Sequence, residues 1–430
     1  EVDELLESDY QTAAIIAPSF PGEFAEIKDY RKLVGMVKAL GFDHVCEVAF
    51  GADMVAREYR KTLTNKNAPP SISSDCPAIV FYVEHYHPEL TPSLAKIASP
   101  MVAMTRILRK KHGEKLKVVF IGPCIAKKAE SDEVDVAITF LELREMFKLR
   151  NITPANTEPK EFDPPKAGKG AVFPISRGLL QTANVSEDIL EGNPITVAEG
   201  RENFREAIEE FENGLIKNQH LELLCCNGCI MGPGMSKGGK RFVRRSLVGN
   251  YVTKKMEEAD PVAFEKAVQE FKDVDFSQTF NPRDRRMDTP TREEIEKALH
   301  DMGKFNAEDH LNCGACGYET CEKHAIAIVQ GLAETEMCLP YTIEKLHSML
   351  TELNVSNNKL ASAREALKQS EKLASMGQLS AGIAHELNNP LGVITMYSNI
   401  LKDEIPEEDP MAQDLELIVE QANRCKGIVG

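Results

Sequence analysis

Eleven cysteines are the residues of this sequence with the clearest chemical potential. Four of them, Cys313, Cys316, Cys321 and Cys338, are separated by two, four and sixteen residues. Four thiolates can bind zinc or an iron–sulfur cluster. Zinc sites often contain a second C-x-x-C pair, which this segment lacks. The spacing therefore favours an iron–sulfur cluster, and zinc or plain structural thiols remain alternatives.

A second group of four cysteines is scattered along the chain. Cys76, Cys124, Cys225 and Cys229 each lie near Pro or Gly, where the backbone can approach a cluster closely. In a reducing compartment clustered thiols indicate metal ligands rather than disulfides. The remaining cysteines stand outside both groups, and small buried hydrophobic roles suit Cys46 and Cys425.

The elements that position these cysteines alternate between strands and helices. Apolar or β-branched runs at 12–17, 78–83, 117–121 and 134–139 predict strands, and 92–111 and 141–149 predict helices. Such alternation predicts layered α/β packing. After Pro340, Gly and Pro disappear until Gly377, which indicates a long helical region.

Leucines recur every seven residues in that region, at Leu346, Leu353, Leu360 and Leu367. This heptad predicts a parallel coiled-coil dimer, and the alternative is one surface helix with a leucine stripe. The intervening heptad positions include Asn357, Arg364 and Glu371, so the second seam is polar and the coil adjustable.

Composition excludes several classes of function. The 430 residues carry a formal charge of −16 without a long Lys/Arg run, which argues against nucleic-acid and anionic-membrane surfaces. The sequence contains neither a signal peptide nor an apolar stretch of about 18 residues. We therefore expect a soluble, cytoplasmic protein that binds no nucleic acid and no membrane.

Two family resemblances concern the cysteines. The segment Cys313-Gly-Ala-Cys316-Gly-Tyr-Glu-Thr-Cys321, with Ala325, Ala327 and Ile328, resembles a known 4Fe-4S module. Around residues 10–300, the chain resembles the catalytic domain of iron-only (FeFe) hydrogenases. The motifs that carry this second resemblance are Ala17-Pro18-Ser19, Ser73-Ser-Asp-Cys76-Pro77, Tyr82 to Leu90, Ser99-Pro100-Met101, Gly122-Pro-Cys124 to Glu130, and Cys225-Cys-Asn-Gly228-Cys229.

The hydrogenase resemblance implies a fold of two α/β lobes that enclose a cofactor. That cofactor is a 4Fe-4S cluster linked through one thiolate to a diiron subcluster with CO, cyanide and a dithiolate bridge. By position, Cys76, Cys124, Cys225 and Cys229 would bind the cubane, and Cys229 would also bridge to the diiron unit. Lys127 matches the lysine that pairs with a cyanide, and Asp75, Ser99 and Met101 are the other expected cofactor-binding residues.

Several positions depart from the family pattern. Asp75 replaces a cysteine that relays protons, and Ile79 replaces a tryptophan. Gly122 replaces a methionine, and Leu221 and Leu223 replace a glutamate and a methionine. The expected ligands are kept while the proton route is changed, which favours a sensor with slow or no turnover. The alternatives are a divergent hydrogenase with another proton route and a fold that holds only the cubane.

The helical end contains a third motif. Leu379-Ser-Ala-Gly-Ile-Ala-His385-Glu386-Leu-Asn-Asn389-Pro390 resembles the phosphoacceptor motif of sensor histidine kinases, whose helical hairpins dimerise as a four-helix bundle. The resemblance implies that His385 attacks the γ-phosphate of ATP, that Glu386 assists it, and that Asn389 orients water for dephosphorylation of a response regulator. No ATP-binding domain lies before the end at Gly430, so we expect a longer polypeptide or phosphorylation from elsewhere. A ferredoxin-like segment, common in the hydrogenase family, would precede Glu1.

We expect four parts: 1–300, an FeFe-hydrogenase-like cofactor domain; 301–340, a 4Fe-4S module; 341–375, a coiled-coil signalling helix; and 376–430, a dimerisation and phosphoacceptor domain. The combined prediction is a homodimeric redox or hydrogen sensor with two 4Fe-4S clusters, a diiron subcluster as a further possibility, and a response regulator as partner. The competing predictions are a catalytic hydrogenase that passes electrons to ferredoxin, and an electron-transfer subunit of a larger redox complex with the helical tail for assembly.

Overall fold

The structure is a computed structural model that describes residues 1–65, 67–186, 195–216, 219–406 and 409–429. The chain divides into two compact units, Glu1–Arg286 and Met287–Gly430, which are described separately. Among the described residues, none of the helices combines the length and apolar character needed to cross a bilayer.

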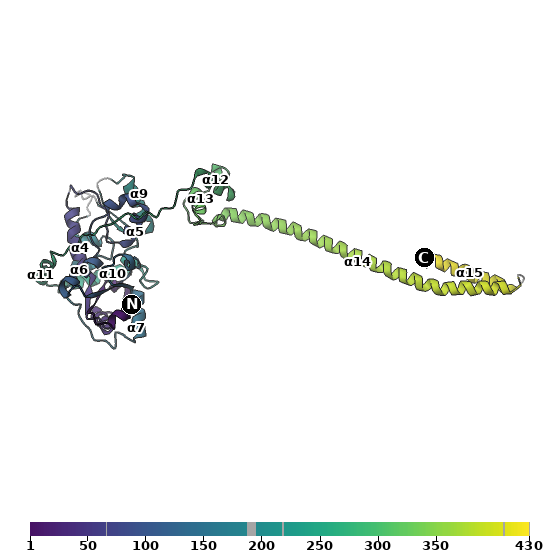
Figure 1. The fold of residues 1–430 in the computed structure, drawn as a ribbon, viewed down its shortest axis with the longest axis horizontal. Helices are drawn as coiled ribbons and strands as arrows, with labels where there is room; N and C mark the ends of the chain where they lie inside the picture. The colour runs from purple at the N-terminus through teal and green to yellow at the C-terminus, as the bar shows by residue number, and fades with distance from the viewer. Residues whose placement is uncertain (66, 187–194, 217–218, 407–408, 430) are drawn as a thin grey trace. The chain divides into compact units, whose positions relative to one another are not determined.

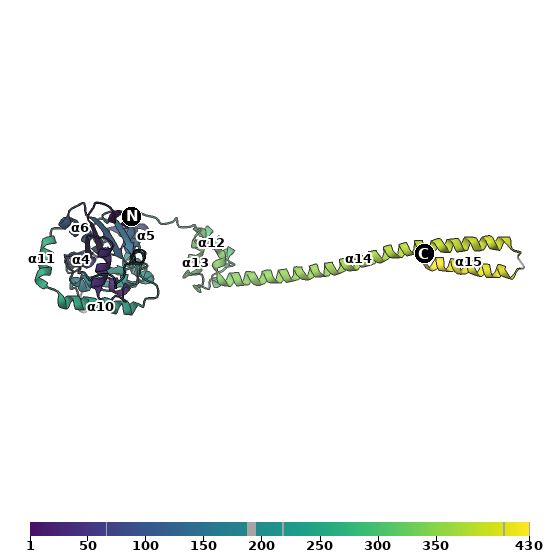
Figure 2. The same cartoon turned by 90° about the horizontal axis from the view of Figure 1, so that it is seen from below.

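The first unit is an α/β fold. Its strands are β1 Thr12–Ile16, β2 His44–Glu47, β3 Lys117–Gly122, β4 Val136–Thr139, β5 Ile195–Glu199 and β6 His220–Leu224. Its helices are α1 Val2–Leu6, α2 Phe20–Glu23, α3 Tyr30–Ala39, α4 Val48–Leu63, α5 Pro77–Tyr86, α6 Pro100–His112, α7 Phe140–Leu149, α8 Gly178–Ala183, α9 Arg201–Glu212, α10 Arg241–Glu258 and α11 Pro261–Phe271. In both views α11 lies at an edge of this unit (Figure 1, Figure 2).

Two parallel sheets define two lobes. The larger sheet has the order β2-β1-β3-β4, and the smaller one pairs β5 with β6. All five residues of β1 are buried, as is typical of a parallel strand covered on both faces. The large sheet packs against α3, α4 and α6 in one hydrophobic core. A separate core, which includes Ile72, Ile79, Phe204 and Leu223, lies at the small sheet. The predicted two-lobed α/β fold is confirmed.

One predicted strand is wrong. Residues 78–83 lie within α5, which begins with Pro77 at its first position and has Cys76 as its N-cap. A short apolar run cannot by itself distinguish a buried strand from a buried helix. Here Pro77 starts the helix, because its fixed φ suits the first turn and its missing N–H costs nothing there.

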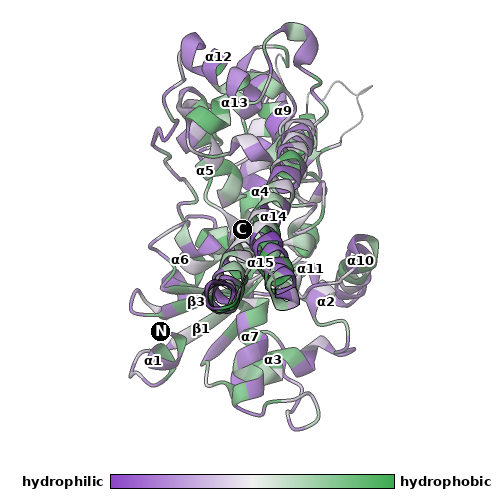
Figure 3. Ribbon diagram, turned by 90° about the vertical axis from the view of Figure 1, so that its right-hand side faces the viewer, coloured by the Kyte–Doolittle hydropathy of each residue, from purple (hydrophilic) through white to green (hydrophobic). Residues whose placement is uncertain are grey.

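The second unit is helical. It contains α12 Arg292–Asp301, α13 Cys321–Val329, α14 Leu339–Glu404 and α15 Pro410–Val429. Ala298, Leu299 and Met302 of α12 pack with Ala325 of α13 in a small core. Helix α15 runs back along the C-terminal part of α14 (Figure 1, Figure 2). Hydrophobic and hydrophilic positions are mixed along both helices (Figure 3), so each has apolar residues to present to a neighbour.

Candidate iron–sulfur and phosphoacceptor sites

The four scattered cysteines lie at the ends of elements in the first unit. Cys76 caps α5, Cys124 follows β3, Cys225 follows β6, and Cys229 begins a 3-10 turn, Cys229–Met231. The carboxyl ends of parallel strands are where open α/β sheets commonly bind ligands. These positions are therefore suited to one shared site.

Backbone hydrogen bonds bring the cysteine-bearing loops together. Ser73 N donates to Leu221 O at 2.8 Å, and Leu223 N donates to Ser73 Oγ at 3.0 Å, which joins the loop before Cys76 to β6. Gly234 N donates to Pro123 O at 2.7 Å, which joins the turn after Cys229 to the loop of Cys124. A Cβ on Gly234 would lie 2.9 Å from Pro123 O, so only glycine permits this approach.

Burial makes the thiols of this group hard to ionise without a partner. Burial raises the pKa of Cys76 to about 12, and the nearby Cys124 and Asp75 act in the same direction. Burial likewise raises the pKa of Cys229 well above its usual range, with Cys76 and Cys124 as neighbours. In contrast, a hydrogen bond from Cys226 lowers the pKa of Cys225 to about 7. Bound iron supplies the positive charge that buried thiolates need, so the donor set fits a cubane cluster.

Among the described residues, no three His, Cys, Asp or Glu side chains are placed to hold one metal ion. The cysteines of a cubane cluster each bind a different iron, so they need not converge as the ligands of one ion do. The geometry is therefore compatible with a cluster at either set of four.

A cavity of about 70 Å³ lies beside Cys124 and Cys229. Three of the expected cofactor-binding residues, Asp75, Met101 and Lys127, line this cavity. Phe120, which the sequence did not indicate, lines it as well. Ser99 lies elsewhere, in a neighbouring polar cavity of about 90 Å³ that also contains Ser74 and Glu130. Of the expected cofactor-binding residues, Asp75, Met101 and Lys127 thus share one cavity and Ser99 lines the next.

Lys127 is held in place by a carboxylate. Its Nζ lies 2.5 Å from Glu130 Oε2 and 3.4 Å from the carbonyl oxygen of Asp75. Burial acts to lower the pKa of Lys127, but Glu130 and the thiols of Cys124 and Cys76 more than offset it, so the pKa is raised. Lys127 therefore remains a cation in the cavity wall, as pairing with an anionic ligand requires.

Asp75 is a buried acid with an open acceptor. Its Oδ1 is buried and has no hydrogen-bond partner in the part of the chain that the structure describes. Burial raises the pKa of Asp75 to about 6, although a backbone amide, Lys127 and Ser73 act to lower it. An unpaired carboxyl oxygen beside this cavity fits a polar group bound there, because buried polar atoms are almost always paired.

The Phe120 ring fills the space that a side chain at Gly122 would need. A Cβ on Gly122 would lie 2.4 Å from Cζ of Phe120 and 3.0 Å from Cβ of Ala17. The Phe120 ring therefore occupies the volume in which the resembling family carries a methionine. Leu221, Leu223 and Ile79, which replace other family residues, are all buried in the core of the small lobe.

Sequence reasoning missed two supports of this site. Tyr59 and Ser74 share a buried contact: their hydroxyl oxygens lie 3.0 Å apart, and Ser74 N donates to the Tyr59 hydroxyl at 2.8 Å. Ser74 Oγ also donates to Ile97 O at 2.7 Å, which fixes the loop next to Asp75. Glu130 ends one of the motifs that resemble the hydrogenases, but its pairing with Lys127 three residues earlier was not predicted.

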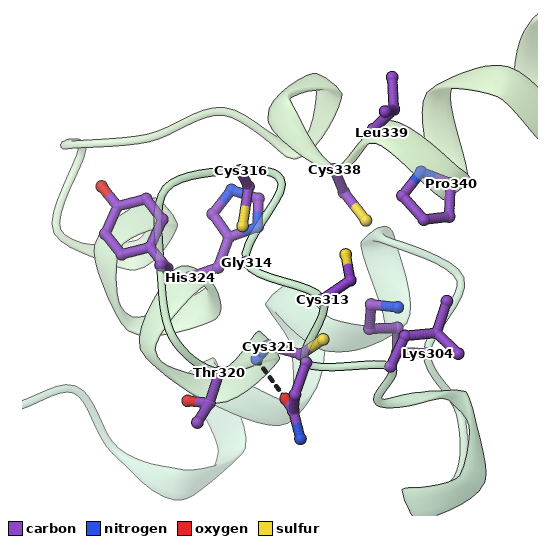
Figure 4. A pocket seen from close by; sticks show the side chains of 13 residues that line it. Lys304, Cys313, Gly314, Cys316, Thr320, Cys321, His324, Cys338, Leu339 and Pro340 are labelled. Carbon is purple, nitrogen blue, oxygen red and sulfur yellow. Dashed lines mark hydrogen bonds between the residues drawn. The ribbon is translucent and has the colours of Figure 1, made fainter.

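The second set of cysteines surrounds a pocket in the second unit (Figure 4). Cys313 and Cys316 come from one loop, Cys321 begins α13, and Cys338 is the N-cap of α14. Asn312 Oδ1 accepts a hydrogen bond from Cys321 N at 2.8 Å, which folds the loop against α13. The positive φ of Gly314 and Gly317 allows that loop to turn.

The three predicted phosphoacceptor residues lie on α14. His385, Glu386 and Asn389 are all exposed on this helix. A phosphoacceptor must be reachable by a separate ATP-bound domain, and the exposure of His385 permits this.

Comparisons with known proteins agree with this geometry. Residues 10–233 match the family "Iron only hydrogenase large subunit, C-terminal domain", and the chain belongs to that family. Residues 309–340 match "Putative Fe-S cluster", and residues 375–430 match "His Kinase A (phospho-acceptor) domain".

Individual relatives cover separate parts of the chain. Iron hydrogenase 1 of Clostridium pasteurianum is 29% identical over 257 residues, which are 47% of this chain and 45% of that protein. Sensor histidine kinase RegB of Cereibacter sphaeroides is 37% identical over 78 residues, 18% of this chain and 17% of that protein. This chain therefore spans less than half of either relative.

A solved structure shows the fold. A variant of [FeFe]-hydrogenase HydA1 from Chlamydomonas reinhardtii superposes with a TM-score of 0.54 at 19% identity, covering 65% of this chain and 98% of that one. The protein is thus a member of the iron-only hydrogenase family that also carries an iron–sulfur segment and a histidine-kinase phosphoacceptor segment.

Proposed function

We propose that this protein is a redox or hydrogen sensor in which the hydrogenase-like unit controls a two-component phosphoacceptor helix. Hydrogenase turnover is slow or absent, and the protein acts as a cytoplasmic homodimer with a response regulator as its output partner. The hydrogenase-like unit contains one 4Fe-4S cluster and receives a diiron subcluster with CO and cyanide ligands. The second unit contains the other cluster, which exchanges electrons with a partner such as ferredoxin.

One observation supports this proposal above the others. Cys338, the last cysteine of the second set, is the N-cap of α14, and His385 lies on that same uninterrupted helix of 66 residues. The distance along the helix is about 70 Å at 1.5 Å per residue. A change of charge or packing at the cysteines therefore acts directly on the N-terminus of α14. His385 lies further along the same helix.

The helix is suited to such a role. The heptad leucines are exposed in the single chain, with Leu367 63% exposed, so they are available to a second copy. The polar seam at Asn357, Arg364 and Glu371 keeps alternative registers close in free energy, which a two-state switch requires.

At the output, the exposed His385 imidazole attacks the γ-phosphorus of ATP. An N–P bond forms, the P–O bond to ADP breaks, and Glu386 accepts the imidazole proton. Asn389 lies one turn further along the helix and orients water for the dephosphorylation of the response regulator.

At the cofactor, the diiron unit when bound would supply reversible hydrogen binding. The residues of this chain would hold and orient it: Cys229 would be the thiolate shared with the cubane, Lys127 would offer a fixed cation, and Asp75 would offer a carboxyl group. Slow turnover is supported by Asp75 in place of the proton-relaying cysteine and by the Phe120 ring in the place of a methionine.

Infrared spectroscopy of the anaerobic protein, matured with the diiron assembly machinery, tests the proposal. Bands of iron-bound CO and cyanide that shift under hydrogen, together with hydrogen-dependent phosphorylation of His385 by an ATP-binding domain supplied in trans, are the expected result. Iron for cubane clusters alone, without such bands, would leave only a redox-responsive regulator. Hydrogen-insensitive and redox-insensitive phosphorylation would contradict the sensor proposal as a whole.

The second candidate function is a working hydrogenase. The open Oδ1 of Asp75 at the cavity wall favours it, because a carboxyl group there can move protons. A hydrogen-dependent dye-reduction assay distinguishes the two: rapid reduction, lost in Asp75→Ala, would favour the enzyme over the sensor.

A further inference from the structure

A buried lysine lies beside the cysteines of the second unit. Lys304 follows the end of α12 and is only 6% exposed. It lines the same pocket as Cys313, Cys316, Cys321 and Cys338, and Figure 4 shows it next to Cys313 and Pro340. Lys304 precedes the segment 309–340 that matches the iron–sulfur family, so the cysteine motif itself does not include it.

The backbone around Lys304 fixes its place. Gly303 has a φ of 71°, which ends α12, and Lys304 N donates to Leu299 O at 2.9 Å. The side chain then reaches Asp309, where Nζ donates to the backbone carbonyl oxygen at 2.8 Å. The lysine is therefore held at the pocket by both its main chain and its ammonium group.

The ammonium group has no carboxylate partner among the described residues within ion-pair distance. The carboxylate of Asp309 is nearby, but its Oδ2 accepts hydrogen bonds from Phe305 N at 3.0 Å and Asn306 N at 2.9 Å. A buried cation that donates to a neutral carbonyl and forms no ion pair is costly, because burial removes its hydration. The four thiolates that line the same pocket are the anions that could compensate for it.

We propose that Lys304 is the countercharge of the cluster held by Cys313, Cys316, Cys321 and Cys338, and that it raises the reduction potential of that cluster. This inference rests on the second cluster of the proposed function. A cubane with four thiolates is an anion, and one-electron reduction by an external low-potential donor adds a further negative charge. A fixed cation stabilises the reduced form more than the oxidised form, and burial limits the screening of that interaction.

The test uses the full chain with both clusters loaded, in redox titrations followed by electron paramagnetic resonance. Lys304→Met keeps the length of the side chain but removes its charge, and we expect it to lower the midpoint potential of one cluster. Lys304→Arg keeps the charge and should leave that potential near the wild-type value. Cys316→Ala should abolish the same signal, which identifies it as the cluster of the second unit.

A matched control comes from α13. Lys323 is close to Cys321 in sequence, but it is 57% exposed and pairs with Glu319 at 2.5 Å. Lys323→Met should leave both potentials unchanged, because water screens an exposed charge. An equal shift in Lys323→Met and Lys304→Met would contradict a specific role for Lys304.

Four further outcomes decide the inference. An unchanged potential in Lys304→Met with full iron content would overturn the inference. If Lys304→Met and Lys304→Gln both fail to load the cluster while Lys304→Arg loads it, the charge is required and the inference stands; failure of all three would show a role in folding alone. A chain without any signal that depends on Cys316 would overturn the inference and its premise together. The readout needs no phosphorylation or hydrogen, so a failure of the sensor proposal would leave it intact.

Discussion

Glu84 accepts a hydrogen bond from the backbone nitrogen of Asn281 at 3.1 Å, and it does so from the end of α5 opposite Cys76. The backbone of the same turn accepts from Arg283 N at 2.9 Å and Arg285 N at 3.0 Å. The segment that leads out of the first unit at Arg286 is thus fastened to the helix that begins at a predicted cluster ligand. Helix α5 therefore connects the predicted cluster ligand Cys76 with residues 281–285 of the first unit.

This relationship predicts the effect of Glu84→Ala. Glu84 is buried, and its loss would leave Asn281 N without an acceptor, at a cost of about 1–2 kcal/mol in the free energy of unfolding. Hydrogen exchange of residues 279–285 should become faster. Glu89→Ala is the control, because Glu89 pairs with Arg286 at the surface and should cost little. Equal protection of the segment in both variants would refute the link.

Gly122→Met should destabilise the first unit. Its side chain would collide with the ring of Phe120, and overpacking in a core typically costs about 1–3 kcal/mol. Adding Phe120→Leu should recover part of that loss, which a double-mutant cycle by urea denaturation can measure. Gly249→Ala is the control: it lies on α10 with open space around it, so it should be neutral or slightly stabilising. Additive losses in the cycle would show that the two positions do not share one volume.

A single cysteine replacement in either set should remove the iron of one cluster and leave the other cluster in place. In protein produced without the diiron assembly machinery, Cys225→Ala and Cys316→Ala should each lower iron and sulfide content by about half, because each set of four thiolates would bind one cluster. The double variant should contain almost none. Cys425→Ala is the control, since Cys425 lies on α15 outside both sets. The buried role expected for Cys425 is wrong, because its side chain is exposed, whereas Cys46 is buried as expected. If anaerobically purified Cys225→Ala protein contained zinc instead of iron, the assignment of the second set of cysteines to an iron–sulfur cluster would be wrong.

His385→Ala should abolish phosphorylation by an ATP-binding domain supplied in trans, because no other nitrogen is placed to accept the phosphoryl group in this motif. Phosphate transfer from labelled ATP, followed on gels that preserve phosphohistidine, measures it. His347→Ala is the control, because His347 is another exposed histidine on the same helix. Persistent labelling of His385→Ala at the wild-type rate would place the phosphoacceptor elsewhere.

Acid should destabilise the first unit through a histidine pair. The rings of His44 and His112 stack with centroids 4.0 Å apart. Burial lowers the pKa of each, and His44 lowers that of His112 further, while Asp163 opposes this and Lys38 and Lys111 reinforce it. The unfolded chain therefore binds protons more readily than the folded one, so stability falls as pH drops below about 6.5.

His112→Phe keeps an aromatic ring against His44 and removes one of the two protonation sites. The loss of stability between about pH 7 and about pH 5 should then be smaller than in the wild type. Urea denaturation at both pH values measures this difference, with the exposed His347→Phe as control. An identical acid sensitivity in wild type and His112→Phe would disprove the role of the pair.

Sequence alone determined the family and the fold class, and the roles of the individual site residues stay predictions. The reason is that glycines, prolines and cysteines at fixed spacing encode local constraints, such as the turns at Gly314 and Gly317 or the cap of Cys338 on α14. The strands at 12–17, 117–121 and 134–139 were predictable for the same reason, since continuous apolar runs suit a sheet buried on both faces.

Only the tertiary structure decided which residues share a cavity. The pairing of Ser73 with β6 places Cys76 beside Cys225 across about 150 residues of sequence, a contact that no local pattern contains. The same is true of Phe120 filling the space over Gly122, of Ser99 lying in the adjoining cavity, and of Lys304 reaching the second set of cysteines. Packing and electrostatic effects depend on how close two side chains lie. For residues far apart in the sequence, the tertiary structure sets that distance.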